Sequence, residues 1–502
     1  MLWSPPGGFL AAEVIVSCRR SILALFVLAP LASDGLEAQG PSSLAALPPP
    51  QADDVEVGFG KVNITPDLDR HVAWMAGYRN NLRATGVHDP LWARAVVLRE
   101  GEAKLALVSV DLVGLQRPAV MKVRERLPGY LHILIASTHN HEGPDVIGLW
   151  GPSQLESGVD PTYVDFVIER IVEAVKAAEG NLMPARATYG TAEAPELVVD
   201  SRMPLVKDPV LRAVKFTAPD GTAIGLLLQF SNHPESLGSR NTLITADFPH
   251  YTIEALEARH GVPVAYFTGA VGGLMSNPSE FRTPDGTVLS DGTFAFAEAY
   301  GEAVARVFDE ALTSAEPLQL SPLTAGAVPV IVPLANPGYR QGRALGVLSR
   351  QAYAWTGRVD SAGEELPAEQ IEGDIALETE VAYVRVGDLH IAGIPGELYP
   401  ELVYGEYQSP ADPNADFPDA PTEPPVMATL PGTKAMIFGL ANDEVGYIIP
   451  KRQWDDVAPY AYGRSEQQYG EVNSVGPEVA PILMEALQRA VRQASRPQRD
   501  SI

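Results

Sequence analysis

Apolar runs bounded by turn residues alternate along the chain with segments of helical spacing. Runs rich in β-branched and apolar residues predict strands. These runs cover 55–64, 94–100, 104–112, 131–138, 211–218, 223–232, 262–269, 324–333, 381–394 and 434–443. Helical spacing predicts helices over 115–127, 161–179, 249–260, 294–314 and 477–496. Strands that alternate with helices indicate an α/β fold with helices on the faces of a sheet.

Local signals refine this picture. The turn Glu-Gly-Glu-Ala joins strands 94–100 and 104–112 as a hairpin, so the core is predicted to be a mixed β-sheet flanked by helices. Asp160 before Pro161 is typical of an N-cap with proline at the first helical position. We expect one large domain over 55–497. The segment 409–425 holds six prolines and no helical period, so it is either a lid or a plain surface loop.

The N-terminal segment has the pattern of a secretory signal peptide. Two arginines are followed by a short apolar run and by a small residue, Ala38, at a plausible cleavage site. We therefore predict a leader over 1–38, a Pro-rich linker over 39–54 and a secreted or periplasmic protein. The run is too short to span a bilayer comfortably, so no transmembrane helix is expected in the mature chain. Cleavage would remove Cys18, the one cysteine in the sequence. The mature chain would then have no disulfide and no thiolate ligand or nucleophile.

Composition excludes some partners. Of the 502 residues 46% are hydrophobic and 20% are charged, as in ordinary globular proteins, which excludes wholesale disorder. The formal net charge of −26 argues against nucleic acid as a partner, because too few cations are present to neutralise phosphates. It also disfavours electrostatic binding to anionic lipid. The oligomeric state is left open.

Three predicted strands end in residues that can bind a metal. His139 and His141 follow strand 131–138, His233 follows strand 223–232, and Glu397 follows strand 381–394. Residues two apart in an extended segment point to the same side, and sites form at strand ends in α/β sheets. Two histidines with a carboxylate are typical of catalytic zinc, which keeps a position for water. The alternatives are hydrogen-bonded core histidines and a glutamate that begins a helix.

Several motifs together resemble one known family. The segments STHNHEGP (137–144), NHP (232–234), PGE (395–397) and TGAVGGLMSNP (268–278) are similar to the catalytic N-terminal domain of the neutral/alkaline, non-lysosomal ceramidase family. TGVHDPLWARAVVL (85–98) and VSVDLVGL (108–115) resemble the opening of that domain. The resemblance runs from about 55 to about 481. It implies a zinc-dependent amidase that cleaves the N-acyl bond of ceramide, or of a related lipid-like acyl amide.

The resemblance also assigns roles to individual residues. It implies that Zn²⁺ is held by His139, His233, Glu397 and Tyr447. His141 would lie beside the metal and donate to the developing oxyanion. Arg202, in DSRMP, would clamp the substrate amide, a role that suits a planar guanidinium. The alternatives are a surface ion pair for Arg202 and an ordinary core tyrosine for Tyr447.

The chain departs from the family in two respects. Where ceramidases carry G-D-x-S-P-N, an ungapped match places Gly273 at the aspartate and Met275 at the serine. Ser276 is the candidate replacement, but only if the loop is re-spaced, so we predict metal-activated water as the nucleophile. The family's C-terminal immunoglobulin-like domain has no room after helix 477–496. These departures keep open a catalytically degenerate ceramidase-like binding protein and a metal-dependent esterase or lactonase.

Other polar residues in these motifs have less defined roles. Pocket or supporting positions are predicted for His88, Asp89, Asp111 and Asp247, with a helix N-cap as the alternative for Asp247. Purely structural roles are predicted for His71, His132, His260 and His390.

Overall fold

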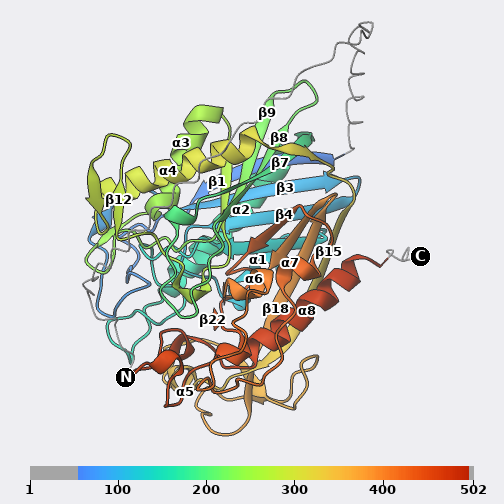
Figure 1. The fold of residues 1–502 in the computed structure, drawn as a ribbon. Coiled ribbons are helices and arrows are strands. Elements are labelled where there is room, and N and C mark those ends of the chain that lie inside the picture. The colour runs from blue at the N-terminus through green and yellow to red at the C-terminus, as the bar shows by residue number, and fades with distance from the viewer. Residues whose placement is uncertain (1–54, 497–502) are drawn as a thin grey trace, which may run out of the picture. The chain divides into compact units, whose positions relative to one another are not determined.

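Three β-sheets form the framework of the computed structural model, which describes residues 55–496 (Figure 1). The first sheet has the order β5 (His132–Ser137), β4 (Ala103–Val110), β3 (Trp92–Glu100), β1 (Val55–Asn63) and β6 (Met183–Pro184). The second has the order β11 (Val264–Thr268), β9 (Ala223–Phe230), β8 (Val210–Thr217), β7 (Arg186–Glu193) and β14 (Glu316–Leu318). The third has the order β17 (Glu365–Leu366), β16 (Ala352–Ala354), β18 (Ile375–Val386), β19 (Leu389–Gly393) and β21 (Ala435–Phe438), with β15 (Leu323–Pro333) paired to β18.

Each of these sheets is mixed, as the sequence predicts. Most neighbouring strands are antiparallel, but β4–β5, β9–β11 and β19–β21 are parallel pairs. The predicted hairpin is confirmed, since β3 and β4 pair antiparallel up to Glu100 and Ala103. The leader over 1–38 and the linker over 39–54 lie outside the described residues, as does position 497.

The three sheets share one inner core. Buried side chains from all of them form a single apolar cluster that includes Val96, Leu227 and Ile391. Phe267 of β11 and Phe438 of β21 stack within it, with ring centroids 4.0 Å apart. This packing joins strands far apart in the sequence, so that their ends meet at the same place.

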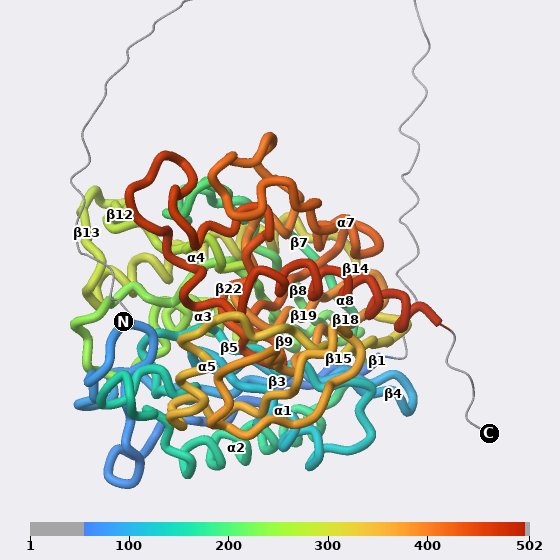
Figure 2. The backbone as a smooth tube through the Cα atoms, turned by 90° about the horizontal axis from the view of Figure 1, so that it is seen from below, coloured from blue at the N-terminus to red at the C-terminus, as the bar shows by residue number. Residues whose placement is uncertain are grey.

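Helices cover the outer face of each sheet. The first sheet packs against α1 (Arg117–Glu125) and α2 (Pro161–Gly180), the second against α3 (Asp247–His260) and α4 (Phe294–Thr313), and the third against α8 (Val479–Ala494). Figure 2 shows α1 and α2 on the same side of β3. The N-cap prediction for α2 is confirmed, because the Asp160 carboxylate accepts from the backbone N–H groups of Thr162 and Tyr163.

Two boundaries differ from the prediction. The segment 381–394 is not one strand: Gly387, at φ 58°, turns the chain between β18 and β19. Asp247 is not the N-cap of α3 but its first residue, and Ala246 occupies the cap. A Gly-Asp turn inside a long apolar run gives only a weak break in hydrophobic pattern, which explains the first error.

Short elements connect the layers. They are β2 (Gly86–Val87), β10 (Leu243–Ile244), β12 (Glu280–Arg282), β13 (Val288–Ser290), β20 (Glu397–Leu398), β22 (Tyr447–Ile448), α5 (Pro337–Ala344), α6 (Glu401–Tyr404) and α7 (Val426–Thr429). Five 3₁₀ turns lie at Pro195–Leu197, Gly272–Leu274, Lys451–Gln453, Ala461–Gly463 and Glu471–Asn473. No helix within 55–496 combines the length and apolar character needed to cross a bilayer.

Candidate active site

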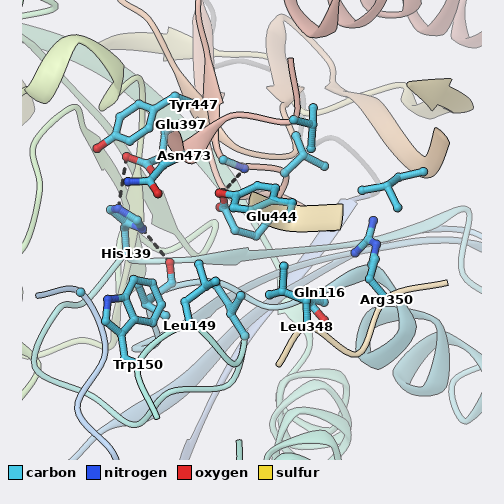
Figure 3. Close-up of a pocket in the computed structure, with 18 of the residues that line it drawn as sticks. Gln116, His139, Leu149, Trp150, Leu348, Arg350, Glu397, Glu444, Tyr447 and Asn473 are labelled. Atoms are coloured by element: carbon cyan, nitrogen blue, oxygen red, sulfur yellow. Dashed lines mark hydrogen bonds and ion pairs between the residues drawn. The ribbon is translucent and has the colours of Figure 1, made fainter. Parts of the chain in front are cut away.

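The predicted metal ligands meet at the carboxyl ends of strands from all three sheets. His139 follows β5, His233 follows β9, and Glu397 follows β19. Tyr447 follows β21 and faces Glu397 across the parallel pair of β20 and β22. Figure 3 shows the side chains of His139, Glu397 and Tyr447 on one side of a pocket.

The three histidine rings and one carboxylate oxygen are in direct contact. Ligand atoms of His139, His141 and His233 all lie within 4.8 Å of one another. Oε2 of Glu397 lies 3.1 Å from Nε2 of His233 and 3.4 Å from Nε2 of His139. Nε2 of His141 lies 3.2 Å from Nε2 of His139. Four donor atoms therefore surround one point.

Backbone carbonyls fix the orientation of two rings. Nδ1 of His139 lies 2.6 Å from the carbonyl oxygen of Val113, and Nδ1 of His233 lies 2.8 Å from that of Met275. A carbonyl only accepts, so both Nδ1 atoms carry hydrogen. When both rings are neutral, the lone pairs on their Nε2 atoms face the carboxylate of Glu397. Lone pairs and a carboxylate repel one another, so a cation between them would stabilise this arrangement. Metal-binding histidines are typically held in this way.

Electrostatics at this point favour positive charge. Burial would raise the pKa of the Glu397 carboxyl, but His139 and His233 outweigh it and hold the pKa well below its usual range. Burial would lower the pKa of His233, but its hydrogen bond to Glu397 raises it. The buried carboxylate thus requires a proton on the imidazoles or a metal ion between them. The donor set fits a metal.

His141 is oriented less firmly than the other two rings. Its Nδ1 is buried without a hydrogen bond, and the nearest carboxylate oxygen, Oε2 of Glu235, is 3.7 Å away. Burial, and then charge on His139 and His233, lowers the pKa of His141 well below its usual value, so the ring stays neutral. Gly77 lies against this ring: a Cβ there would sit 2.5 Å from its Cγ.

Tyr447 completes the group. It is buried, and burial followed by the charge of Glu397 raises the pKa of its phenol well above the usual value. The phenol ring makes edge contacts with Tyr399 and Tyr469, at centroid distances of 6.2 and 5.7 Å. These contacts hold the ring beside Glu397.

A pocket opens from this cluster (Figure 3). Its empty volume, including the open mouth, is about 830 Å³, in the range typical of small-molecule sites. His139, His141, Glu397 and Tyr447 line it together with apolar side chains, among them Val113, Ile147, Leu149, Trp150, Leu334, Leu348, Leu377, Val445 and Val475. The arrangement joins a polar reacting centre to an apolar chamber.

Arg202 is absent from the lining of this pocket. Nη2 of Arg202 donates to Oε1 of Glu471 at 2.6 Å and to the carbonyl of Gln453 at 3.1 Å. Its guanidinium stands over the ring of Tyr399, 5.3 Å from the centroid. The ion pair is fully buried rather than on the surface, and the role of Arg202 as a substrate clamp stays a prediction.

Ser276 is also absent from the pocket lining. Its hydroxyl donates to Oε1 of Glu235 at 2.5 Å. The side chain of Met275 is fully buried in the core between the second sheet and its helices. Glycine is required at position 272 because the loop runs directly against Tyr399. A Cβ there would lie 2.3 Å from the tyrosine ring.

Other predicted residues hold the surrounding loops. Asp111 forms a buried ion pair with Arg94 at 2.7 Å. Asp89 accepts from the backbone N–H of Ala246 at 2.8 Å, and the ring of His88 stacks on Phe294. The histidines predicted to be structural pair elsewhere, His71 with Asp160, His132 with Glu380, His260 with Asp309 and His390 with Tyr383.

The proline-rich loop does not line the pocket. Residues 409–425 contain no helix or strand and attach to the segment that follows Pro450. The backbone N–H of Asp416 donates to the carbonyl of Trp454, and both carboxylate oxygens of Asp416 accept backbone N–H groups. In this conformation the loop belongs to the surface beside the third sheet.

Sequence reasoning missed three residues near the centre. Glu235 links Ser276 to His141, and Gln116 and Glu444 line the pocket. Glu235 lies two residues after His233 and Glu444 three before Tyr447, so proximity to predicted ligands was the available signal. Each is a single polar residue without a periodic pattern, which gave no reason to select it.

Comparisons with known proteins show what this chain resembles. Residues 55–276 match the family model for the N-terminal region of neutral/alkaline non-lysosomal ceramidase. Neutral ceramidase of Pseudomonas aeruginosa is 27% identical over 305 residues, which are 53% of this chain and 45% of that protein. Neutral ceramidase of Mycobacterium tuberculosis is 28% identical over 221 residues, 38% of this chain and 34% of that protein. These alignments thus span less than half the length of each relative.

Solved structures show the same fold. The crystal structure of neutral ceramidase from Pseudomonas aeruginosa superimposes with a TM-score of 0.65 at 17% identity, over 89% of this chain and 76% of that chain. A structure described as ceramidase complexed with C2 gives 0.64 at 18% identity, over 89% and 77%. The family model over 55–276 and the two relatives support placing the chain with the neutral/alkaline non-lysosomal ceramidases, and the solved structures show that it has the ceramidase fold.

Proposed function

We propose that this protein is a zinc-dependent hydrolase that cleaves the N-acyl amide bond of ceramide or a related lipid-like amide. The nucleophile in this proposal is metal-activated water. The relatives described as neutral ceramidases support the reaction class. We also propose that the protein is exported, because the apolar run before Ala38 has the pattern of a signal peptide.

One observation carries the proposal: Nε2 of His139, Nε2 of His233 and Oε2 of Glu397 converge, with both Nδ1 atoms held by carbonyls. Nitrogen and oxygen donors of this kind form catalytic zinc sites. Tyr447, paired in register with Glu397, would be the fourth protein ligand. Zinc bound there would lower the pKa of water to about 7 and polarise the scissile carbonyl.

The chain's own residues supply the rest of the chemistry. His141 stays neutral and has no acceptor bonded to Nδ1, so it can carry its hydrogen on Nε2 and donate to the oxyanion. The apolar lining from Ile147 to Trp150 would hold the acyl chain and exclude water. Ser276 would act through Glu235 on His141 rather than as a nucleophile, because its hydroxyl is bonded to Glu235 and does not line the pocket.

Metal analysis combined with turnover tests the proposal. The purified protein would be assayed for zinc by mass spectrometry and for fatty acid released from N-acyl amides, with and without chelator. His139→Ala and Glu397→Ala should lose both zinc and turnover. His260→Ala is the matched control, since His260, the last residue of α3, pairs with Asp309 of α4 and does not line the pocket.

The same assay separates the alternatives. Zinc without hydrolysis of amides or esters would indicate a ligand-binding protein. Hydrolysis of esters alone would indicate an esterase or lactonase. Hydrolysis of amides that persists after complete removal of metal would contradict the proposal.

A further inference from the structure

Two polar side chains in the pocket wall have hydrogen-bonding capacity that the protein does not use. They are Glu444, in the loop before β22, and Gln116, directly before α1. In Figure 3 they stand across the pocket from His139 and Tyr447. The wall around them is formed largely by apolar side chains, so an unused polar atom there marks a place for a polar group of the ligand.

Glu444 is held in place by one of its two oxygens. Oε1 accepts the backbone N–H of Gly446 at 2.7 Å. Oε2 is buried and has no partner in residues 55–496. The side chain packs closely against Gly114, where an added Cβ would lie 3.0 Å from Cγ of Glu444. An orphaned acceptor of this kind is costly unless a ligand or water satisfies it.

Gln116 lies two residues beyond Gly114 and is half-buried. It is the N-cap residue of α1, but its side chain makes no capping bond. None of the hydrogen bonds within 55–496 uses its amide group. Burial and then the negative charge of Glu397 raise the pKa of the Glu444 carboxyl well above its usual value, so its Oε2 can carry a hydrogen. The pair therefore offers a carboxyl on Glu444 and an amide on Gln116, each of which can donate or accept.

Neither neighbouring arginine forms an ion pair with Glu444. Arg350 is committed to both carboxylate oxygens of Asp443 and to the carbonyl of Glu378. Arg343 donates to backbone carbonyls, at 2.9 Å to Arg350 and at 3.1 to 3.5 Å to residues 366, 367 and 370. Both cations are thus satisfied within the protein.

We propose that Glu444 and Gln116 form a specificity subsite that binds a hydroxyl group of the substrate. The hydroxyl group, which can both donate and accept, forms hydrogen bonds with Oε2 of Glu444 and with the Gln116 amide. A neutral hydroxyl satisfies both side chains at a lower desolvation cost than an ammonium group. This inference rests on the proposed function, because it assumes that the substrate amide lies at the metal centre.

The test compares amides that differ by one group. The amine-side pair is N-dodecanoyl ethanolamine and N-dodecanoyl propylamine, in which a methyl replaces the hydroxyl. The acyl-side pair is the propylamide of 2-hydroxydodecanoic acid and that of dodecanoic acid. N-dodecanoyl ethylenediamine supplies the ammonium group. Turnover is measured as kcat/KM, and binding to the chelator-treated protein is measured by calorimetry.

In one of the two pairs, the kcat/KM of wild type should be at least about tenfold higher for the amide that carries the hydroxyl. The amide without the hydroxyl leaves Glu444 without a hydrogen-bond partner. Glu444→Leu and Gln116→Leu should bring that ratio close to one, and Glu444→Gln should keep part of it. Glu485→Leu, on the exposed side of α8, is the matched control. The pair that shows the preference tells whether the hydroxyl lies on the amine or on the acyl part.

Three results would overturn the subsite: equal use of both members of each pair by wild type, an unchanged preference in Glu444→Leu, or tighter binding of the ammonium amide. Binding requires no turnover, so the subsite and the hydrolysis are judged separately. A hydroxyl preference in binding without hydrolysis would refute the proposed reaction only. Hydrolysis without a hydroxyl preference would refute the subsite only.

Discussion

The backbone carbonyl of Met275 accepts two hydrogen bonds from His233, one from its backbone N–H at 2.9 Å and one from Nδ1 at 2.8 Å. The methionine side chain points instead into the core of the second sheet. The position at which the family resemblance expects a serine therefore orients a metal-site histidine through its backbone. This contact needs no particular side chain, so loss of the serine leaves the centre intact.

Gly77→Ala tests whether the position of His141 matters. The new Cβ would lie 2.5 Å from the ring, and we expect kcat/KM to fall about 100-fold while zinc content stays unchanged. Gly221→Ala is the matched control, because Gly221 has a similar positive φ but nothing within 4 Å of its Cβ position. Steady-state kinetics and metal analysis give the readout. Equal kinetics in the two variants would refute a role for His141.

Ser276→Ala tests the nucleophile. The hydroxyl donates to Glu235 and does not line the pocket, so we expect kcat to fall by no more than about tenfold, the effect of losing one supporting hydrogen bond. Removal of a serine nucleophile instead lowers kcat by about 10⁴-fold or more. A loss of that size would mean that the loop re-forms around substrate and that serine attacks.

Arg202→Met separates a structural role from a substrate clamp. Breaking the buried pair with Glu471 should lower the free energy of unfolding by about 3–5 kcal/mol in urea titrations. The double variant Arg202→Met/Glu471→Leu should recover part of this loss, because no buried charge then lacks a partner. Unchanged stability together with a raised KM would show that Arg202 serves the substrate alone.

Buried acids near Arg202 predict that stability depends on pH. Burial raises the pKa of Glu401 to about 8. Between its unfolded value near 4.5 and about 8, the folded protein keeps a proton that the unfolded chain has lost, so stability falls as pH rises. Glutamine mimics the protonated acid, so the advantage of Glu401→Gln over wild type should grow between about pH 5 and 8. Urea titrations at saturating zinc measure it, and a constant difference would contradict the assignment.

Sequence patterns located many of the strands and brought together several residues of the candidate site. Apolar runs located most strands of the sheets, and residues directly after β5, β9 and β19 turned out to meet. The partnership of Glu397 with Tyr447 depends on two-residue strands whose pairing is set by the third sheet, which no local pattern specifies. Family resemblance alone suggested Tyr447.

The remaining contacts were beyond sequence reasoning for physical reasons. A carbonyl such as that of Met275 carries no side-chain signal, and the pairing of Ser276 with Glu235 depends on how the loop folds over β9. Glu444 could be selected only from the structure, in which its buried Oε2 has no hydrogen-bond partner. Long-range packing decided each of these contacts.

The most direct test of the account is a zinc titration of the metal-free protein, followed by hydrolysis of an N-acyl amide. The four-residue site predicts that turnover is absent without metal, rises linearly and stops rising at about one zinc per chain. His139→Ala should show no such rise at these concentrations. Full turnover before any zinc is added, or a wild-type titration curve retained in His139→Ala, would contradict the central claim.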